Sequence, residues 1–290
     1  MKEKNFFAQD PTAIAKAYQS LVILRAAQPE LHWSALIDSA FDYPETDQAP
    51  YHADALNCYD AEIFEGLHNA APCLLPLPED ESSVTRVLWH CRGRPMLSIV
   101  ASVAPPSALI KSWLPLHWVY DDDDQRMLLR IADTRVAPVL ARVLTPAQWA
   151  AWTARLAHWL IIDRAGQLTH CPLAEPDVTQ DASLRLTRAQ LDQLVHAAEP
   201  DAVIDLLAQG MPDILPATLP KSQLYAMVAE SCALGHLCGV EGHSDIVALA
   251  VAACLSEGRS NRDPRLPGLL RAAQWASGEL GEFLVNEGFV

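Results

Sequence analysis

Arg130 and Asp133 are the two charged residues whose setting first suggests chemistry. They lie in the stretch LLRIADTRVAPVL, where an apolar run ends and an amphipathic helix is expected to begin. They could be catalytic groups of an active site, or charges that hold a corner of the fold together. In an extended strand, side chains three positions apart point to opposite faces, so these two would not pair with each other. Each therefore needs a partner of its own.

We favour the structural interpretation for both charges. A guanidinium group inside a sheet costs free energy unless a carboxylate meets it, and the best-placed carboxylates are Asp38, at the end of the first expected strand, and Asp60. Asp133 precedes TRVAPVLARVL and suits the N-terminal end of that helix, where its side chain can accept unpaired backbone N–H groups. The sequence thus predicts that Arg130, Asp133 and Asp38 form ion pairs or caps, and it predicts no catalytic residue.

The densest group of potential metal ligands lies in CALGHLCGVEGH, which contains Cys232, His236, Cys238 and His243. Cys232 and His236 are four residues apart and would share one helix face, as metal ligands can. The stretch has neither a C-x-x-C nor an H-E-x-x-H pattern, so we expect no bound metal and no other cofactor. Whether these four residues ever bind metal stays open.

Other catalytic signatures are missing from the sequence. The twelve glycines form no G-x-S-x-G, P-loop or G-x-G-x-x-G motif. His90 and Cys91 are adjacent only in sequence, and neighbours on a strand point apart, which argues against a Cys–His nucleophile. The run Asp121 to Asp124 lacks the spacers and glycine of a calcium loop and is expected to be a solvated hairpin tip.

The eight tryptophans fall into two groups. Trp149, Trp152 and Trp159 have helical spacing and predict one buried helix face. Trp113, Trp118 and Trp275 have no such clear place. Because aromatic anchors are enriched at protein–protein contacts, these three are candidate partner-binding residues.

Composition limits the class of protein. Half of the 290 residues are apolar and a fifth are charged, which indicates a folded chain, and the length favours two packed lobes. The formal net charge of −15 argues against binding to nucleic acid or to an anionic membrane surface. No run approaches the ~18 apolar residues of a membrane span, so no membrane insertion is expected.

The compartment follows from the N-terminus and the cysteines. MKEKNFFAQDPTAIAK has charges but no apolar stretch behind them, so we do not expect a signal peptide. The seven cysteines are odd in number and irregularly spaced, which is typical of reduced thiols. The expected localisation is cytoplasmic.

The expected fold class is α+β: an N-terminal mixed α/β lobe with a small, partly antiparallel sheet, followed by an all-helical C-terminal lobe. The lobes are expected at residues 1–171 and 187–290, with a polar linker at 172–186. The expected strands of the first lobe are SALIDSAF, an edge segment PCLLPLP, RPMLSIVAS, a hairpin of LHWVY and QRMLLRIAD, and a pair in LIIDRAGQLTH. Its expected helices are 12–27, AEIFEGLHNA, PPSALIKSWL and TPAQWAAWTARLAHW, the last with a capping box at its start. The second lobe is expected to contain helices near 187–198, 201–209, 224–234 and 246–254, and a fifth in PGLLRAAQWASGEL.

Four segments in series carry a resemblance to a known family: LHWSALIDSAF, LHNAAPCLLPL, MLSIVASVAPPSALIKSWL and LLRIADTRVAPVLARVLTPAQ. Together they resemble the effector chaperones of bacterial type VI secretion, the Tap or TEC adaptors, long catalogued as a domain of unknown function. The resemblance covers about residues 20–170, and the strand-Arg-x-x-Asp-helix stretch followed by Thr-Pro-x-Gln is its most specific element. Ser39 departs from the Asp-Gly-Ala that the family often shows after the first strand.

The resemblance implies a non-enzymatic adaptor that holds a cognate effector protein and helps to load it onto the VgrG spike, sometimes through a PAAR tip. Binding would be stoichiometric, and the acidic helical lobe would recognise a basic or neutral effector. Two alternatives remain. One is a hydrolase or metal-dependent enzyme with an unrecognised site, for example around His236, Cys238 and His243. The other is an immunity protein that neutralises a secreted toxin.

Overall fold

The computed structural model describes residues 6–175, 178–179 and 185–290, and its contacts divide the chain into two units. The sheet unit is Pro11–Leu194, and the helical unit is Val195–Val290 together with Met1–Asp10. The predicted α+β class is confirmed, with a small antiparallel sheet and helices in the first unit and helices in the second. This division lies inside helix α6 (Arg188–Gly210), whereas we expected boundaries at 171 and 187. Parts of two expected segments lie outside the described residues. These are residues 176–177 and 180–184 of the linker and residues 1–5 at the N-terminus.

The sheet unit is built on a six-stranded antiparallel sheet with the order β2-β3-β1-β4-β7-β8. Its strands are β1 (His32–Asp38), β2 (Leu56–Asn57), β3 (Pro72–Pro76), β4 (Leu97–Ser102), β7 (Leu156–Ile162) and β8 (Leu168–His170). Six of the seven residues of β1 are buried, because both faces of the sheet are covered. Leu36 and Val100 belong to the core on one face, and Ile37 and Ile99 belong to the core on the other.

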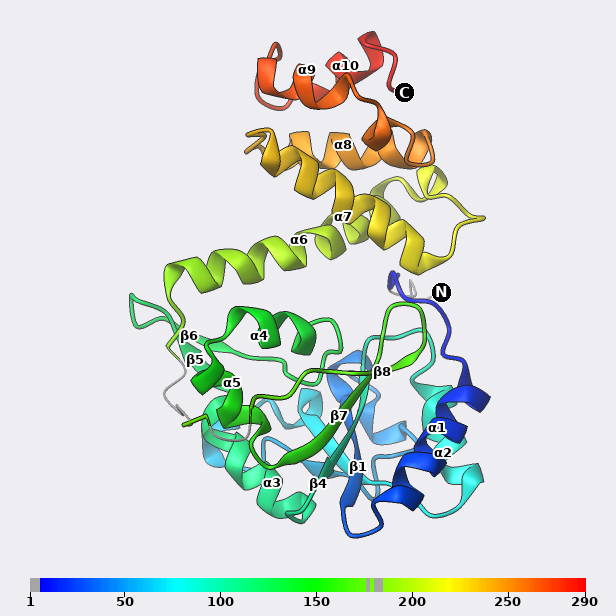
Figure 1. The fold of residues 1–290 in the computed structure, drawn as a ribbon, viewed down its shortest axis with the longest axis vertical. Helices are drawn as coiled ribbons and strands as arrows, with labels where there is room; N and C mark the ends of the chain where they lie inside the picture. Colours follow the sequence, from blue (N-terminus) through cyan, green and yellow to red (C-terminus); the bar gives the residue numbers. More distant parts are fainter. Residues whose placement is uncertain (1–5, 176–177, 180–184) are drawn as a thin grey trace. The chain divides into compact units, whose positions relative to one another are not determined.

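Helices cover the two faces in separate groups (Figure 1). α1 (Ile14–Ala27) and α2 (Glu81–His90) pack side by side over one core. The other core contains residues of α3 (Pro106–Trp113), α4 (Ala137–Val143) and α5 (Pro146–Thr153). A separate hairpin, β5 (Trp118–Tyr120) and β6 (Arg126–Leu128), carries the acidic turn at its tip.

Several predicted elements of the sheet unit need correction. The helix that begins at the Thr145 capping box ends at Thr153, and Trp159 lies in β7, because LAHWLII pairs with β4 instead of continuing the helix. AEIFEGLHNA forms two short 3-10 turns, Glu62–Phe64 and His68–Ala70, since Gly66 adopts a φ of +83° between them.

Two further differences concern the neighbours of β1. β3, expected at an edge, lies between β1 and the two-residue β2. Helix α2 was not expected at all. Its N-cap Asp80 accepts a hydrogen bond from the Ser83 backbone N–H, so His90 ends a helix and does not lie on a strand.

The helical unit contains α7 (Lys221–Leu237), α8 (His243–Leu255), α9 (Leu266–Ala272) and α10 (Leu280–Asn286) in addition to most of α6. The two short helices expected around Pro200 are one continuous helix. The single helix expected in PGLLRAAQWASGEL is instead α9 and the start of α10, because Ala273 adopts a left-handed conformation with a φ of +46° and ends α9. Within the described residues, none of the helices has both the length and the apolar character needed to cross a bilayer.

Candidate functional site

The Arg130 guanidinium meets a carboxylate at the end of β1. Its Nη2 lies 2.8 Å from Asp38 Oδ2, across 92 positions of sequence. Of the two partners considered from the sequence, Asp38 and Asp60, the structure therefore contains the pair with Asp38. The Arg130 side chain is 43 % exposed, whereas that of Asp38 is 1 % exposed. The pair thus joins a buried carboxylate to a guanidinium group at the surface.

Asp38 is buried by its position at the end of a central strand. It lies opposite Pro72 of β3, and its backbone N–H donates to the Met96 carbonyl at 2.9 Å. Its Oδ1 accepts a hydrogen bond from the Ala40 backbone N–H at 3.2 Å. Burial raises the pKa of Asp38 to about 6, although the Arg130 charge acts in the opposite direction.

Asp133 pairs with Arg135 and not with Arg130. The carboxylate accepts from Arg135 Nε at 3.0 Å and from Nη2 at 2.7 Å, a bidentate pair. It also accepts the Arg135 backbone N–H at 3.0 Å, so it does take up a free N–H near the helix start. The N-cap of α4 is Val136, however, so the expected cap at Asp133 is displaced by one turn. The next residue, Thr134, donates its backbone N–H to Pro95 and attaches this loop to the segment before β4.

A second buried carboxylate, Asp42, lies on the other side of the 39–41 turn and was not found from the sequence. It accepts hydrogen bonds from Tyr51 Oη at 2.5 Å and Arg94 Nη1 at 2.6 Å, and His90 Nε2 lies 2.9 Å from it. Burial alone would raise the pKa of Asp42, but the hydrogen bonds from His90, Tyr51 and Arg94 outweigh it and lower the pKa to about 2. The partners are 9 to 52 residues away in the sequence, too far for a local pattern to reveal them.

A small pocket of about 160 Å³ lies beside the Arg130–Asp38 pair. Its lining residues are Asp38, Ala40, Tyr59, Leu67, Ala70, Pro72, Leu128 and Arg130. Arg130 also lies 5.0 Å from the Phe41 ring. The two ionised groups of the pocket bind each other, and its described lining contains no serine, cysteine, lysine or histidine. This arrangement stabilises the end of β1.

Burial argues against nucleophilic chemistry at the cysteines. All seven are buried and none forms a disulfide. Burial raises the pKa of Cys58, Cys91 and Cys171 to about 12, so these side chains remain thiols at neutral pH. Cys91 therefore cannot act with His90 as a nucleophile, and His90 is bound to Asp42.

The three candidate partner-binding tryptophans have different environments. Trp113 is 1 % exposed and donates its Nε1–H to the Trp152 carbonyl at 2.9 Å, so it is a core residue and cannot anchor a partner. Trp118 is half-buried between Phe64 and Arg126, and Trp275 is half-buried against Phe283. For these two, a contact with a partner stays a prediction. Sequence reasoning overlooked Trp89, which is 59 % exposed because it lies on the outer face of α2.

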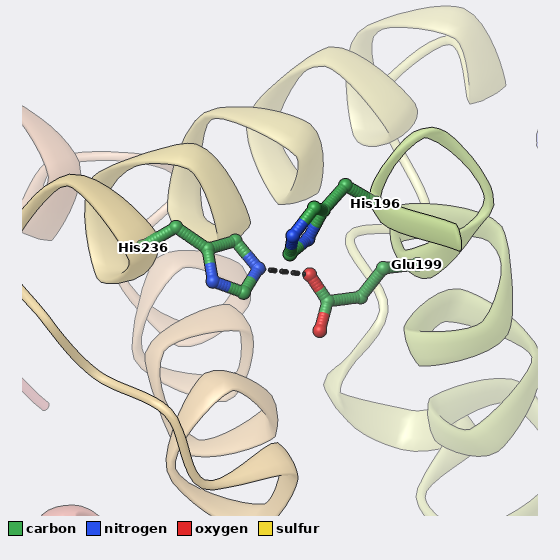
Figure 2. A group of neighbouring side chains, drawn as sticks. All are labelled: His196, Glu199 and His236. Atoms are coloured by element: carbon green, nitrogen blue, oxygen red, sulfur yellow. Dashed lines mark hydrogen bonds and ion pairs between the residues drawn. The ribbon is translucent and has the colours of Figure 1, made fainter. Parts of the chain in front are cut away.

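The four metal-ligand candidates of CALGHLCGVEGH do not converge. Cys232 and Cys238 are buried, and Cys238 Sγ lies 3.7 Å from the Pro267 carbonyl. His243 is the exposed first residue of α8. Burial raises the pKa of Cys232 to about 12, and the nearby Glu199 carboxylate adds to this shift. His236 instead meets Glu199 and His196, two residues of α6 that the sequence did not bring to attention (Figure 2).

Comparison with known proteins finds one similarity, and it falls in the sheet unit. Residues 33–151 match the model of a family described as "Domain of unknown function (DUF4123)". No curated protein and no solved structure matches the chain. The matched segment extends from β1 into α5 and includes Asp38, Asp42, Arg130 and Asp133. The sheet unit of this chain is therefore similar to the DUF4123 family over residues 33–151.

Proposed function

We propose that this protein is a non-enzymatic adaptor that binds a cognate effector of a bacterial type VI secretion system and promotes its loading onto the VgrG or PAAR spike protein. The observation that carries the proposal is the DUF4123 match over residues 33–151. Four segments of the sequence resemble the Tap and TEC adaptors. The match includes the whole of three of these segments, and it includes LHWSALIDSAF from Trp33 onward. In this role the protein acts in the cytoplasm, before the effector is exported.

The chemistry of the matched segment supports a scaffold. Asp38 and Asp133 are each held by an arginine, and Asp42 is held by three donors. Asp42 and Asp133, bound in this way, are poor bases or nucleophiles, because their release would leave a buried charge unpaired. Their effect is to fix the ends of strands and the turns between them.

The surface of the sheet unit has features to which a polypeptide could bind. An open groove of about 600 Å³ lies along α1 and the start of β1, and Tyr18, Val22, Arg25 and Trp33 are among its lining residues. Large apolar side chains are also exposed elsewhere on this unit, including Trp89 and Val103. Exposed aromatic and aliphatic groups of this kind are common at protein-binding surfaces. The net charge of −15 favours an effector surface that is basic or neutral.

The decisive experiment is co-expression with the product of the neighbouring gene, the expected effector. We expect the effector to be soluble only with this protein and the two to elute as a stoichiometric complex in size-exclusion chromatography with light scattering. Added spike protein should then bind the complex more tightly than it binds the effector alone. A protein that binds neither the effector nor the spike contradicts the proposal.

The same preparation separates the adaptor from the two alternatives. An immunity protein would abolish the activity of the toxin within the complex, whereas an adaptor that holds another segment leaves that activity measurable. A hydrolase would turn over substrate without any partner. Assays of the isolated protein against ester, peptide and phosphoester substrates test that alternative.

A further inference from the structure

We propose that His196, Glu199 and His236 form a binding site for a divalent transition-metal ion, with zinc as the ion that suits the ligands best. One potential ligand atom from each residue lies within 4.8 Å of the other two. His236 Nε2 is 2.5 Å from Glu199 Oε2, and the two imidazole rings are 4.5 Å apart between their centroids. Figure 2 shows the three side chains pointing toward one another from two facing helices.

The two helices explain why these residues meet. His196 and Glu199 are three positions apart on α6, so they lie on the same face, one turn apart. His236 lies in the last turn of α7 and approaches that face from the second helix. All three residues belong to the helical unit, so the site does not depend on how the two units are placed.

The donor set selects the class of ion. Two imidazole nitrogens and one carboxylate oxygen are a common three-ligand set for zinc, which then takes a water molecule as its fourth ligand. Calcium and magnesium prefer oxygen donors throughout, so the two histidines argue against them. The ligand set therefore points to zinc, with cobalt and nickel as usable substitutes.

Only small movements would be needed to bind the ion. With bonds of ~2.0–2.1 Å, the ligand atoms of a tetrahedral zinc site lie ~3.3 Å apart. The contact of 2.5 Å between Glu199 and His236 would lengthen by less than ~1 Å, and no other separation between the ligand atoms exceeds 4.8 Å. His236 is 33 % exposed and Glu199 is 15 % exposed, so these side chains have room to rotate toward the ion.

The electrostatic environment also favours a cation. Within the part of the chain that the structure describes, Glu199 forms no ion pair with a lysine or an arginine, in contrast to Asp38 and Asp42. His236 lies at the C-terminal end of α7, where the helix dipole is negative. Pro200 has no N–H, so the His196 carbonyl cannot accept the usual helical hydrogen bond from position 200. Each feature adds negative potential close to the three ligands.

The test is a zinc titration of the full-length protein, freed of any polyhistidine tag, against a competing chromophoric chelator. We expect one equivalent of zinc per chain. Replacement of zinc by Co²⁺ should produce visible absorption bands with the intensity of a tetrahedral site. His196→Ala, Glu199→Gln and His236→Ala should each weaken zinc binding by more than about tenfold. His243→Ala is the matched control, since His243 is an exposed histidine of the same unit outside the cluster, and it should leave the affinity unchanged.

A second measurement guards against misfolded variants. Far-ultraviolet circular dichroism without metal should be the same for the wild type and all four variants. Zinc should raise the Tm of the wild type and of His243→Ala but not that of the three ligand variants. A wild-type protein that binds no stoichiometric zinc overturns the proposal, and so does binding that survives all three ligand substitutions. Neither result bears on the adaptor function, which is tested by effector binding alone.

Discussion

Two carboxylate clusters, one in each unit, differ in what holds the carboxylate. In the sheet unit, Asp38 and Asp42 are buried and each is bound by an arginine. In the helical unit, Glu199 is bound by the neighbouring His236, and both side chains are partly exposed. A buried carboxylate paired with arginine cannot change partners without a large loss of stability. A carboxylate beside exposed imidazoles can exchange its partner for a metal ion at small cost. The first arrangement suits a scaffold, and the second suits a binding site.

The largest effect is expected at Asp42. Asp42→Ala leaves Arg94, His90 and Tyr51 without their shared acceptor, and we expect it to lower the free energy of unfolding by about 3 kcal/mol. Urea denaturation followed by tryptophan fluorescence measures this change in the sheet unit, since every tryptophan except Trp275 lies there. Glu79→Ala is the control, because Glu79 is 97 % exposed in its pair with Arg25 and should have no measurable effect. Equal stability of Asp42→Ala and the wild type would show that the network does not hold this turn.

A smaller, pH-dependent effect is expected at Arg130. Arg130→Met leaves Asp38 buried without its counter-charge, and we expect a loss of about 2 kcal/mol at pH 8. The loss should shrink at pH 5. The pKa of Asp38 is raised from 3.8 to about 6 in the folded protein. Protonation of Asp38 therefore stabilises the folded state, fully below pH 3.8, and this stabilisation is lost as the pH rises through about 6. Urea denaturation at both pH values measures the difference. In the Asp38→Asn background the dependence of the Arg130→Met effect on pH should disappear, and its persistence would assign it to another group.

Asp42 should produce the opposite pH dependence. Its pKa is lowered from 3.8 to about 2, so the stability that its carboxylate contributes is complete above pH 3.8 and is lost as the pH falls toward 2. We expect Asp42→Asn to flatten the acid limb of the stability curve and to leave the slope of the curve between pH 4 and pH 6 unchanged. Urea denaturation across pH 2 to 6 checks this. A parallel shift of the whole curve would contradict the difference between the two carboxylates.

The smallest effect is expected in the helical unit. Without metal, Glu199→Gln should change the free energy of unfolding by less than about 1 kcal/mol, because the contact with His236 is partly exposed and the amide can still accept a hydrogen bond. Thermal unfolding followed by circular dichroism measures it. A loss of stability as large as that of Asp42→Ala would show that Glu199 also belongs to a structural ion pair. That result would contradict the difference between the two carboxylate clusters.

Local patterns determined much of the secondary structure. The apolar runs SALID and LSIVAS predicted β1 and β4, and the Thr145 capping box predicted where α5 begins. These features depend on residues that are close in the sequence. A strand forms where the side-chain types favour it, and a helix begins where a side chain accepts hydrogen bonds from the free backbone N–H groups. The partner of Arg130 was narrowed to two carboxylates, because a guanidinium near a sheet needs a counter-charge.

Tertiary structure decided the remaining features. LAHWLII has a helical spacing of apolar residues, and only its pairing with β4 makes it a strand. The Asp42 network joins residues up to 52 positions apart, and the His196–Glu199–His236 cluster joins α6 to α7 across 37 positions. In both clusters, side chains meet because helices and strands pack against one another. The spacing of residues along the chain does not predict that packing.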